Sequence, residues 1–194
     1  MIRLGNFNVV LDACILYDSH IRDLLLRLAE KELYQPIWSN SICEEVHRNL
    51  KNRIGDEKSS KIIKIINEAF PEALIDNYCK AINILDDRIN EKDRHVLATA
   101  ICANAQVIVT TNLKDFPNSI LKEYTIEAQS PDTFLTNLFY LSFDKVFNSY
   151  IEMEKSFKNP IITREELFNR FSARTPNFCN LLKPYLSKNI IKIY

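Results

Sequence analysis

The chain contains few residues of the kinds that interrupt regular structure. It has only two glycines and seven prolines among 194 residues, while hydrophobic residues make up 46% and charged residues 26%. This balance excludes a disordered chain and is typical of an ordered globular protein, in which we expect helix to dominate. The length suits one well-buried α/β domain with a small addition and is too short for two full-sized domains.

Metal-binding cysteine spacings and long apolar runs are both absent from the sequence. The five cysteines are scattered without any CxxC spacing, and most stand beside apolar residues. We therefore expect buried, reduced thiols rather than disulfides or zinc ligands. The longest apolar runs, such as Val107–Val109, span only a few residues, and the first residues show no signal-peptide pattern. These features predict a cytoplasmic protein without a membrane span.

Acidic residues are missing from the last part of the chain. The formal net charge is zero, but residues 1–166 carry 25 acids and 20 bases, whereas residues 167–194 carry no acid and five bases. This basic arm suits a phosphate backbone, a solvated surface or an acidic partner equally well. Its bases are Arg170, Arg174, Lys183, Lys188 and Lys192.

The order of apolar patterns predicts an α/β fold built on a parallel sheet. Strands are expected at 7–12, 83–85, 106–110 and near 124–126, and helices around 21–28, 42–50, 57–69 and 92–104. Such alternation places helices on both faces of the sheet and gathers ligands beyond the carboxyl ends of its strands.

Beyond a boundary near residue 130, only helices are expected. Ser130 and Pro131 have the character of a helix start. Helices are predicted around 132–141, 143–156, 163–172 and 176–186. The sequence therefore predicts a domain over residues 1–130 and a helical module over residues 131–194.

Helical phase singles out two acids. Glu45 lies about 100° from the centre of the Ile42–Val46–Leu50 stripe and so borders its buried face, although a first-turn acid also favours the helix dipole. Asp93 lies within about 10° of the inward stripe of its own helix, where either a cap-like hydrogen bond or a metal ion would satisfy the charge. His95 lies about 200° from Asp93 and is expected at the surface, not as a ligand.

Two further acids follow predicted strands. Asp12 comes directly after the first strand, and Asp115 lies in the loop after the strand at 106–110; each alone also suits a turn or a cap. Together the four acids reach one edge of the expected sheet. Such a cluster suits Mg²⁺, which prefers oxygen ligands and activates water for phosphodiester hydrolysis. In this arrangement Asn112 is expected to orient water or phosphate, and Thr110 to brace the loop.

Five motifs in register resemble the PIN domain, and in particular the VapC-like toxins of type II toxin–antitoxin systems. They are Val9–Tyr17, Arg22–Leu26, Trp38–Leu50, Asp93–Ala98 and Val107–Pro117. The resemblance covers residues 1–130. It implies a three-layer α/β fold with a short central parallel sheet flanked by helices, to which the C-terminal helices are an extension.

The resemblance also implies an activity. Asp12, Glu45, Asp93 and Asp115 match the family's catalytic, metal-binding acids, and Thr110 and Asn112 match its substrate-side polar positions. The implied function is an endoribonuclease that depends on Mg²⁺, with Mn²⁺ able to substitute. A cognate antitoxin is expected to wrap the toxin and block its site, often on a toxin homodimer. The stretch 86–92 is longer and more charged than the family pattern, which leaves open whether Asp86 or Asp87 also reaches the metal.

Basic residues offer two candidate paths for RNA, with ordinary surface charge as the alternative. One path is the basic arm from Arg170 to Lys192, and the other consists of Arg48, Lys51, Arg53, Lys58, Lys61 and Lys64. The alternative function is a catalytically inactive PIN-like RNA-binding or scaffold protein, which the presence of all four acids disfavours. A magnesium-dependent phosphoacceptor is also disfavoured, because Asp12 stands alone after its strand and no DxD motif occurs.

Overall fold

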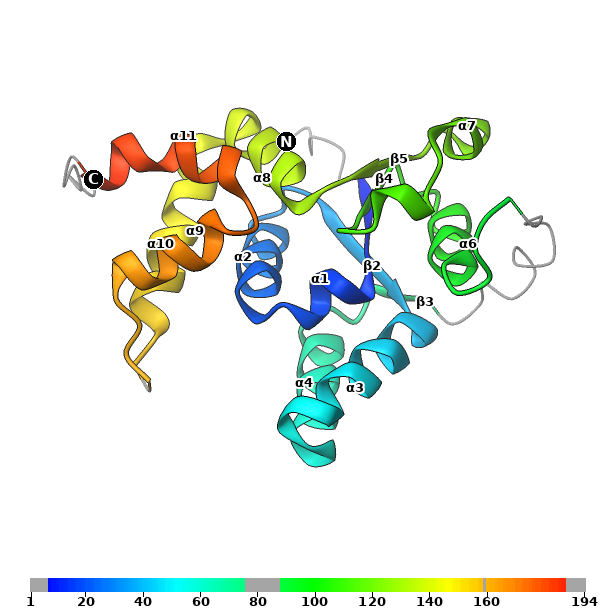
Figure 1. The fold of residues 1–194 in the computed structure, drawn as a ribbon, viewed down its shortest axis with the longest axis horizontal. Helices are drawn as coiled ribbons and strands as arrows, with labels where there is room; N and C mark the ends of the chain where they lie inside the picture. Colours follow the sequence, from blue (N-terminus) through cyan, green and yellow to red (C-terminus); the bar gives the residue numbers. More distant parts are fainter. Residues whose placement is uncertain (1–6, 76–87, 159, 188–194) are drawn as a thin grey trace.

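A five-stranded parallel sheet forms the centre of the computed structural model, which describes residues 7–75, 88–158 and 160–187 (Figure 1). The strands, in the spatial order β3-β2-β1-β4-β5, are β3 (Leu74–Ile75), β2 (Gln35–Ser39), β1 (Asn8–Leu11), β4 (Val107–Val109) and β5 (Glu127–Gln129). All four strand pairings are parallel. The first strand of the sequence therefore lies in the middle of the sheet.

The register of the two central strands aligns their carboxyl ends. Val9, Val10 and Leu11 are 0% exposed, as expected of a strand covered on both faces. Leu11 pairs with Val109. The residues that follow these two strands, Asp12 and Thr110, consequently emerge side by side at one edge of the sheet.

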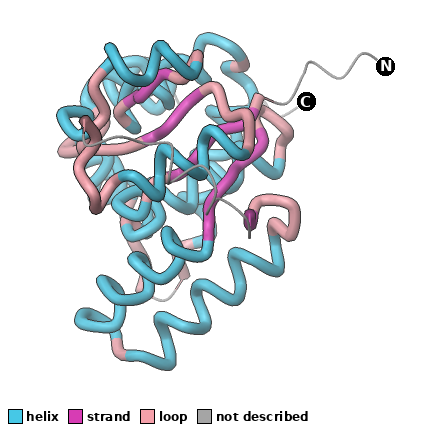
Figure 2. Tube along the Cα trace, turned by 90° about the vertical axis from the view of Figure 1, so that its right-hand side faces the viewer, coloured by secondary structure: helices cyan, strands magenta, loops and turns pink. Residues whose placement is uncertain are grey.

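Helices cover both faces of the sheet, as the alternation of patterns predicts (Figures 1 and 2). Those between the strands are α1 (Ala13–Tyr17), α2 (Ser19–Glu30), α3 (Asn40–Ile54), α4 (Asp56–Ala69), α6 (Arg94–Cys102) and α7 (Asn118–Leu121). Ser39 caps α3 by accepting from the Ile42 N–H, and the Ile42–Val46–Leu50 stripe is buried. Gly55 joins α3 to α4 with φ 89° and ψ 163°, a backbone conformation that is strained for any residue with a Cβ.

Four helices follow the sheet, in agreement with the prediction: α8 (Pro131–Leu141), α9 (Phe143–Ser156), α10 (Arg164–Ser172) and α11 (Pro176–Ser187). Phe134 of α8 contacts the rings of Phe7 and Tyr34, at centroid distances of 6.4 Å and 5.2 Å. The C-terminal helices therefore share one hydrophobic core with the sheet. The division of the chain at residue 130 stays a prediction.

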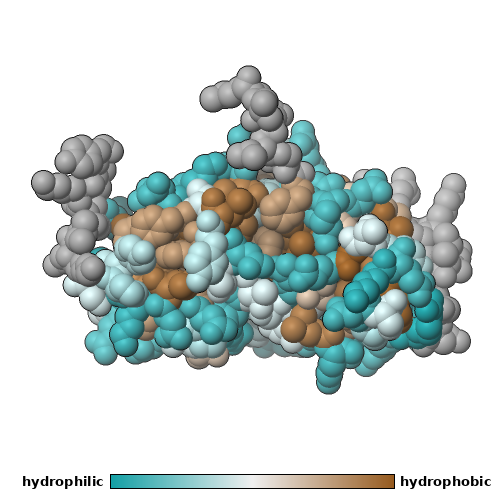
Figure 3. All heavy atoms as spheres, turned by 90° about the horizontal axis from the view of Figure 1, so that it is seen from above, coloured by the Kyte–Doolittle hydropathy of each residue, from teal (hydrophilic) through white to brown (hydrophobic). Residues whose placement is uncertain are grey.

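The C-terminal helices also leave apolar side chains in contact with solvent. Tyr140 is 72% exposed, Leu141 62% and Tyr185 45%. Seen from above, hydrophobic surface gathers over the region of α8 and α11 (Figure 3). Within the described ranges, no helix combines the length and apolar character that a bilayer crossing requires.

The strand predictions were wrong in three places. Strand β2 was not anticipated, because Gln35–Ser39 shows no alternation of polar and apolar residues. The last strand lies at Glu127–Gln129 instead of 124–126, because Lys122–Tyr124 form a 3₁₀ turn and Thr125 adopts the left-handed conformation, with φ 57°. The short strand β3 was not anticipated, since two residues carry no periodic signal. The strand expected at 83–85 lies outside the described residues.

The cysteines of the described ranges are free, as predicted. Cys43 and Cys179 are buried and Cys14 is half-buried, whereas Cys102 is exposed, contrary to the expectation of buried thiols. Cys79 lies outside the described residues.

Candidate active site

Asp12 is held by hydrogen bonds at the point where β1 ends and α1 begins. One carboxylate oxygen accepts from the Ala13 N–H at 2.6 Å, which caps α1, as the cap interpretation of this residue anticipated. The other oxygen accepts from the Thr110 hydroxyl at 2.6 Å and from the Cys14 thiol at 3.2 Å. Asp12 is only 5% exposed, so these donors fix the direction of a nearly buried carboxylate.

Thr110 and Cys14 form the support beneath Asp12. The Thr110 hydroxyl also accepts from the Asn112 N–H at 3.0 Å, and Thr110 is fully buried. The Cys14 sulfur accepts from the Thr111 N–H at 3.3 Å, and burial together with the Asp12 charge raises the pKa of the thiol to about 11. Cys14 is therefore protonated at neutral pH and donates to Asp12, and Thr110 braces the carboxylate and the loop from inside the protein.

Asp93 stands at the N-cap position of α6 but makes no side-chain capping bond there. Of the two explanations left open for this inward carboxylate, the cap is therefore not realised. Burial raises the pKa of Asp93, and the nearby carboxylates of Asp115, Asp12 and Glu45 raise it further, while His95 acts in the opposite direction. The four acids singled out from the sequence thus face one another closely enough to interact through their charges.

His95 is turned toward this acidic cluster, so its expected surface position was wrong. Its Nε2 atom lies 3.6 Å from the Glu45 carboxylate, and its side chain is only 17% exposed. That nitrogen is buried and has no hydrogen-bond partner among the described residues. The phase argument failed because α6 begins at Arg94, with Asp93 preceding it at φ −105° and ψ −7°, so the two residues do not share one regular helix.

A cleft of about 790 Å³ opens over three of the four acids. Glu45 is half-buried on α3 while Glu44 beside it is exposed, as the helical phase predicted. Arg48 and Asn112 are exposed at the same cleft. Its lining residues are Ser41, Glu44, Glu45, Arg48, Asn90, Glu91, Lys92, Asp93, His95, Asn112 and Asp115.

The donor set of this site fits a hard divalent cation. Carboxylate oxygens are the ligands that Mg²⁺ prefers, and a cation between these acids would relieve the repulsion that Asp93 experiences. Across the described ranges, no three His, Cys, Asp or Glu side chains stand close enough to hold an ion together. The chemistry of the residues therefore matches a magnesium site, and their side chains must draw together to form it. Asp86 and Asp87 lie outside the described residues.

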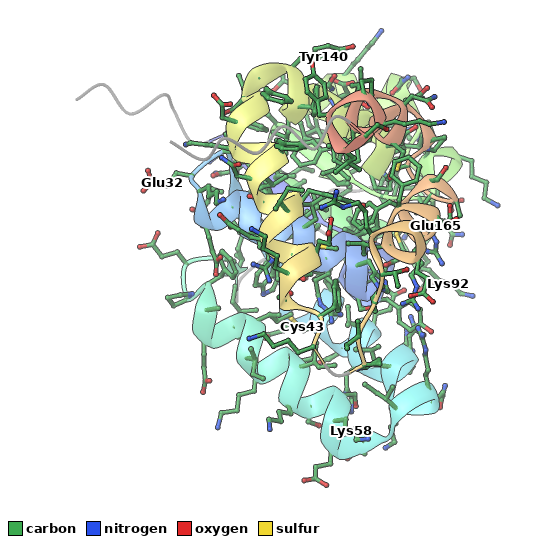
Figure 4. The ribbon with its side chains drawn as sticks, turned by 90° about the vertical axis from the view of Figure 1, so that its left-hand side faces the viewer. Glu32, Cys43, Lys58, Lys92, Tyr140 and Glu165 are labelled. Atoms are coloured by element: carbon green, nitrogen blue, oxygen red, sulfur yellow. The ribbon has the colours of Figure 1, made fainter. Side chains whose placement is uncertain are left out.

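Three polar contributors to the site were not anticipated from the sequence. Asn90 and Glu91 line the cleft, and Lys92 brings a cation to it (Figure 4). All three lie in the charged stretch 86–92. The departure of this stretch from the family pattern was the one feature of the sequence that could have pointed to them. A stretch without regular periodicity does not show which of its side chains point inward.

A comparison with protein families decides the classification. The model of the PIN domain matches residues 8–114, which is more than half of the chain. The chain belongs to the PIN domain family. The matched region contains Asp12, Glu45 and Asp93 and ends one residue before Asp115.

A curated protein shares part of its sequence with this chain. The chain is 40% identical over 87 residues to a protein of Mycobacterium tuberculosis named "Putative ribonuclease VapC50"; the match covers 45% of this chain and 52% of that protein. The chain thus spans about half the length of this curated relative.

Two solved structures share weaker likenesses. One is VapBC2 from Rickettsia felis bound to a DNA fragment from its promoter, with 18% identity and a TM-score of 0.46. The other is VapBC-1 from nontypeable Haemophilus influenzae, with 19% identity and a TM-score of 0.44. Each likeness covers 64% of this chain and 98% of the solved chain.

Proposed function

We propose that this PIN domain protein is an Mg²⁺-dependent endoribonuclease, with Mn²⁺ able to substitute. The proposal rests mainly on the arrangement of four carboxylates near the carboxyl ends of β1 and β4, those of Asp12, Glu45, Asp93 and Asp115. Burial and the charges of the other three raise the pKa of Asp93. Asp93 is partly buried, makes no capping hydrogen bond and lies beside three like charges. A bound cation would stabilise a carboxylate in such a place.

The four carboxylates are the proposed metal ligands, and the remaining polar side chains hold the substrate. The bound ion supplies a water of lowered pKa and stabilises negative charge on the phosphate. Thr110 and Cys14 fix the direction of the Asp12 carboxylate by donating to it. Arg48 and Asn112, both exposed at the cleft, are placed to bind a phosphate of the RNA chain and hold it against the acids.

The proposed partners are a cognate antitoxin and a second copy of this chain, with which it would form a homodimer. The name of the curated relative and the titles of the two solved complexes motivate the antitoxin. In this proposal the antitoxin covers the cleft, and its removal frees the nuclease.

The proposal is tested by incubating total cellular RNA with the purified, antitoxin-free chain and Mg²⁺ or Mn²⁺. Controls are EDTA and an Asp12→Asn/Asp93→Asn double variant whose fold is verified by circular dichroism. We expect discrete RNA fragments that require the metal and are absent with the variant. Intact RNA in the presence of metal-loaded wild-type protein would instead support the catalytically inactive RNA-binding protein.

A further inference from the structure

A second polar pocket lies where the C-terminal helices meet the sheet-bearing part of the molecule. It has a volume of about 330 Å³ and shares no lining residue with the acidic cleft. Its polar side chains come from the α1–α2 turn, the end of α3 and the α10–α11 region. They are Tyr17, Asp18, Ser19, His20, Arg53, Arg170 and Arg174. Three arginines thus converge from two distant parts of the chain.

The contacts within this pocket leave an excess of positive charge. Arg174 pairs with Asp18 at 2.6 Å, so one arginine is neutralised. Arg170 Nη1 lies 3.0 Å from His20 Nε2, and burial together with the Arg170 charge lowers the pKa of His20. Arg53 lies over the Tyr17 ring, 5.8 Å from its centroid, and has no ion pair within the described ranges. The charges of Arg53 and Arg170 are therefore available to an anion.

The position of the pocket relates it to the acidic cleft. Helix α1 begins beside Asp12 and ends at Tyr17, which spans about 7.5 Å. Helix α3 carries both Arg48 at the cleft and Arg53 at the pocket, five residues or about 7.5 Å further along. Helix α1 therefore runs from the edge of the sheet that carries Asp12 to the arginine pocket, which Tyr17 lines.

We propose that this arginine pocket binds a backbone phosphate of the RNA whose cleavage occurs in the acidic cleft, an inference that rests on the proposed nuclease function. Guanidinium groups present paired donors that match phosphate oxygens, which makes arginine well suited to such a site. The C-terminal helices then contribute two of the three arginines to substrate binding. The pocket fixes where the RNA strand lies relative to the carboxylates, without reading its bases.

The test is the affinity of wild-type protein and an Arg53→Gln/Arg170→Gln variant for a fluorescent single-stranded RNA, measured in EDTA over a range of salt concentrations. Neither residue pairs with Asp18, so the cap of α2 is retained. The matched control is Lys122→Gln/Lys145→Gln, which removes the same charge from exposed positions outside both candidate RNA paths. Thermal melting verifies the fold of each variant. If the double variant is unstable, Arg53→Lys replaces it, because lysine keeps the positive charge but lacks the paired N–H donors of the guanidinium group.

We expect the arginine variant to bind RNA about tenfold more weakly and its log–log salt slope to fall by about 0.7, the value for one lost phosphate contact on a single strand. An unchanged affinity and slope, or an equal loss in the lysine control, would overturn the inference. An unchanged affinity and salt slope would indicate that the pocket binds an acidic partner protein instead of RNA. Because binding is measured without metal, failure here is distinct from failure of the nuclease proposal, which appears only as absent cleavage.

Discussion

At the scale of single residues, the direction of the Asp12 carboxylate depends on a hydroxyl 98 positions away in the sequence. Thr110 follows β4 and Asp12 follows β1, and the parallel pairing of the two strands brings their side chains to 2.6 Å. A buried donor of this kind acts on the reaction through Asp12, because it is itself fully covered.

Replacing Thr110 with valine tests this support. Thr110→Val keeps the volume and removes the donor, so we expect a 10- to 100-fold loss of metal affinity or RNA cleavage, as is typical when a partner of a metal ligand is lost. Thr110→Ser, which retains the hydroxyl, is the matched control and should recover most of the activity. The measurement is the Mg²⁺ concentration dependence of cleavage. A valine variant with wild-type dependence would contradict the assigned role.

The raised pKa of Asp93 predicts that this residue weakens the metal-free fold at neutral pH. A carboxyl whose folded pKa is raised contributes stability below its ordinary pKa of about 3.9, and that contribution is lost as the pH rises through the folded value. Asp93→Asn should therefore melt at a higher temperature than wild type in EDTA at pH 7, and the gap should close below about pH 4. The exposed Asp144→Asn is the control, and Mg²⁺ should raise the melting temperature of wild type more than that of Asp93→Asn.

Residue-scale reasoning from the sequence succeeded where local geometry determined the outcome. The half-buried position of Glu45 beside the exposed Glu44 could be predicted because helical phase is a local property. His95 could not be placed, because its orientation depends on where α6 starts, and the burial of Val96–Ala100 on nearly all sides leaves no clear outer face. The contact of Thr110 with Asp12 required the strand register, which no local pattern contains.

At the scale of secondary-structure elements, a buried carboxylate joins two of the C-terminal helices. Asp132 of α8 is 8% exposed and accepts from the N–H groups of Asn177 and Phe178, at 3.2 Å and 2.9 Å, and from the Asn177 side chain. These are the otherwise unsatisfied donors at the first turn of α11. One side chain thus caps α11 from a different helix.

We expect Asp132→Ala to lower the free energy of unfolding by about 2–4 kcal/mol, because three charge-assisted hydrogen bonds are lost in a buried place. Urea unfolding measures the effect, and the control is Asp144→Ala on the exposed first turn of α9. Metal-dependent cleavage should survive at a temperature where the variant remains folded. A change of less than 0.5 kcal/mol would show that water replaces the carboxylate without cost.

The starts of helices could be predicted where a capping residue precedes them. Ser39, Ser130 and Thr163 each cap a helix that was expected from the sequence. The errors at β3 and β5 occurred in elements of two and three residues, which are too short to show alternation. Strand β2 was missed because its five residues do not alternate.

At the scale of the whole molecule, the C-terminal helices and the PIN fold form one hydrophobic core, although helical patterns alone suggested a separable module. The ring of Phe134 is 2% exposed and packs edge-on against Tyr34 beneath the sheet. Composition marks where a new pattern starts, but it does not show whether the new part folds independently.

The shared core predicts that a fragment ending at residue 130 does not fold stably. The matched single change is Phe134→Ala, for which we expect a loss of about 3–5 kcal/mol, since a large buried ring leaves a cavity. Tyr140→Ala, on the same helix but 72% exposed, should stay within about 0.5 kcal/mol of wild type. Circular dichroism melts check all three. A cooperative melt of the 1–130 fragment would instead establish an independent domain.

The position of β1 in the middle of the sheet has a consequence for synthesis. The strand that precedes Asp12 is synthesised before its neighbour β4 and the supporting Thr110, which follow about a hundred residues later. Contacts between such distant segments form late, because the intervening chain must first be closed into a loop. A growing chain therefore presents Asp12 without its supporting hydroxyl until β4 has been made, and the proposed site is incomplete during that interval.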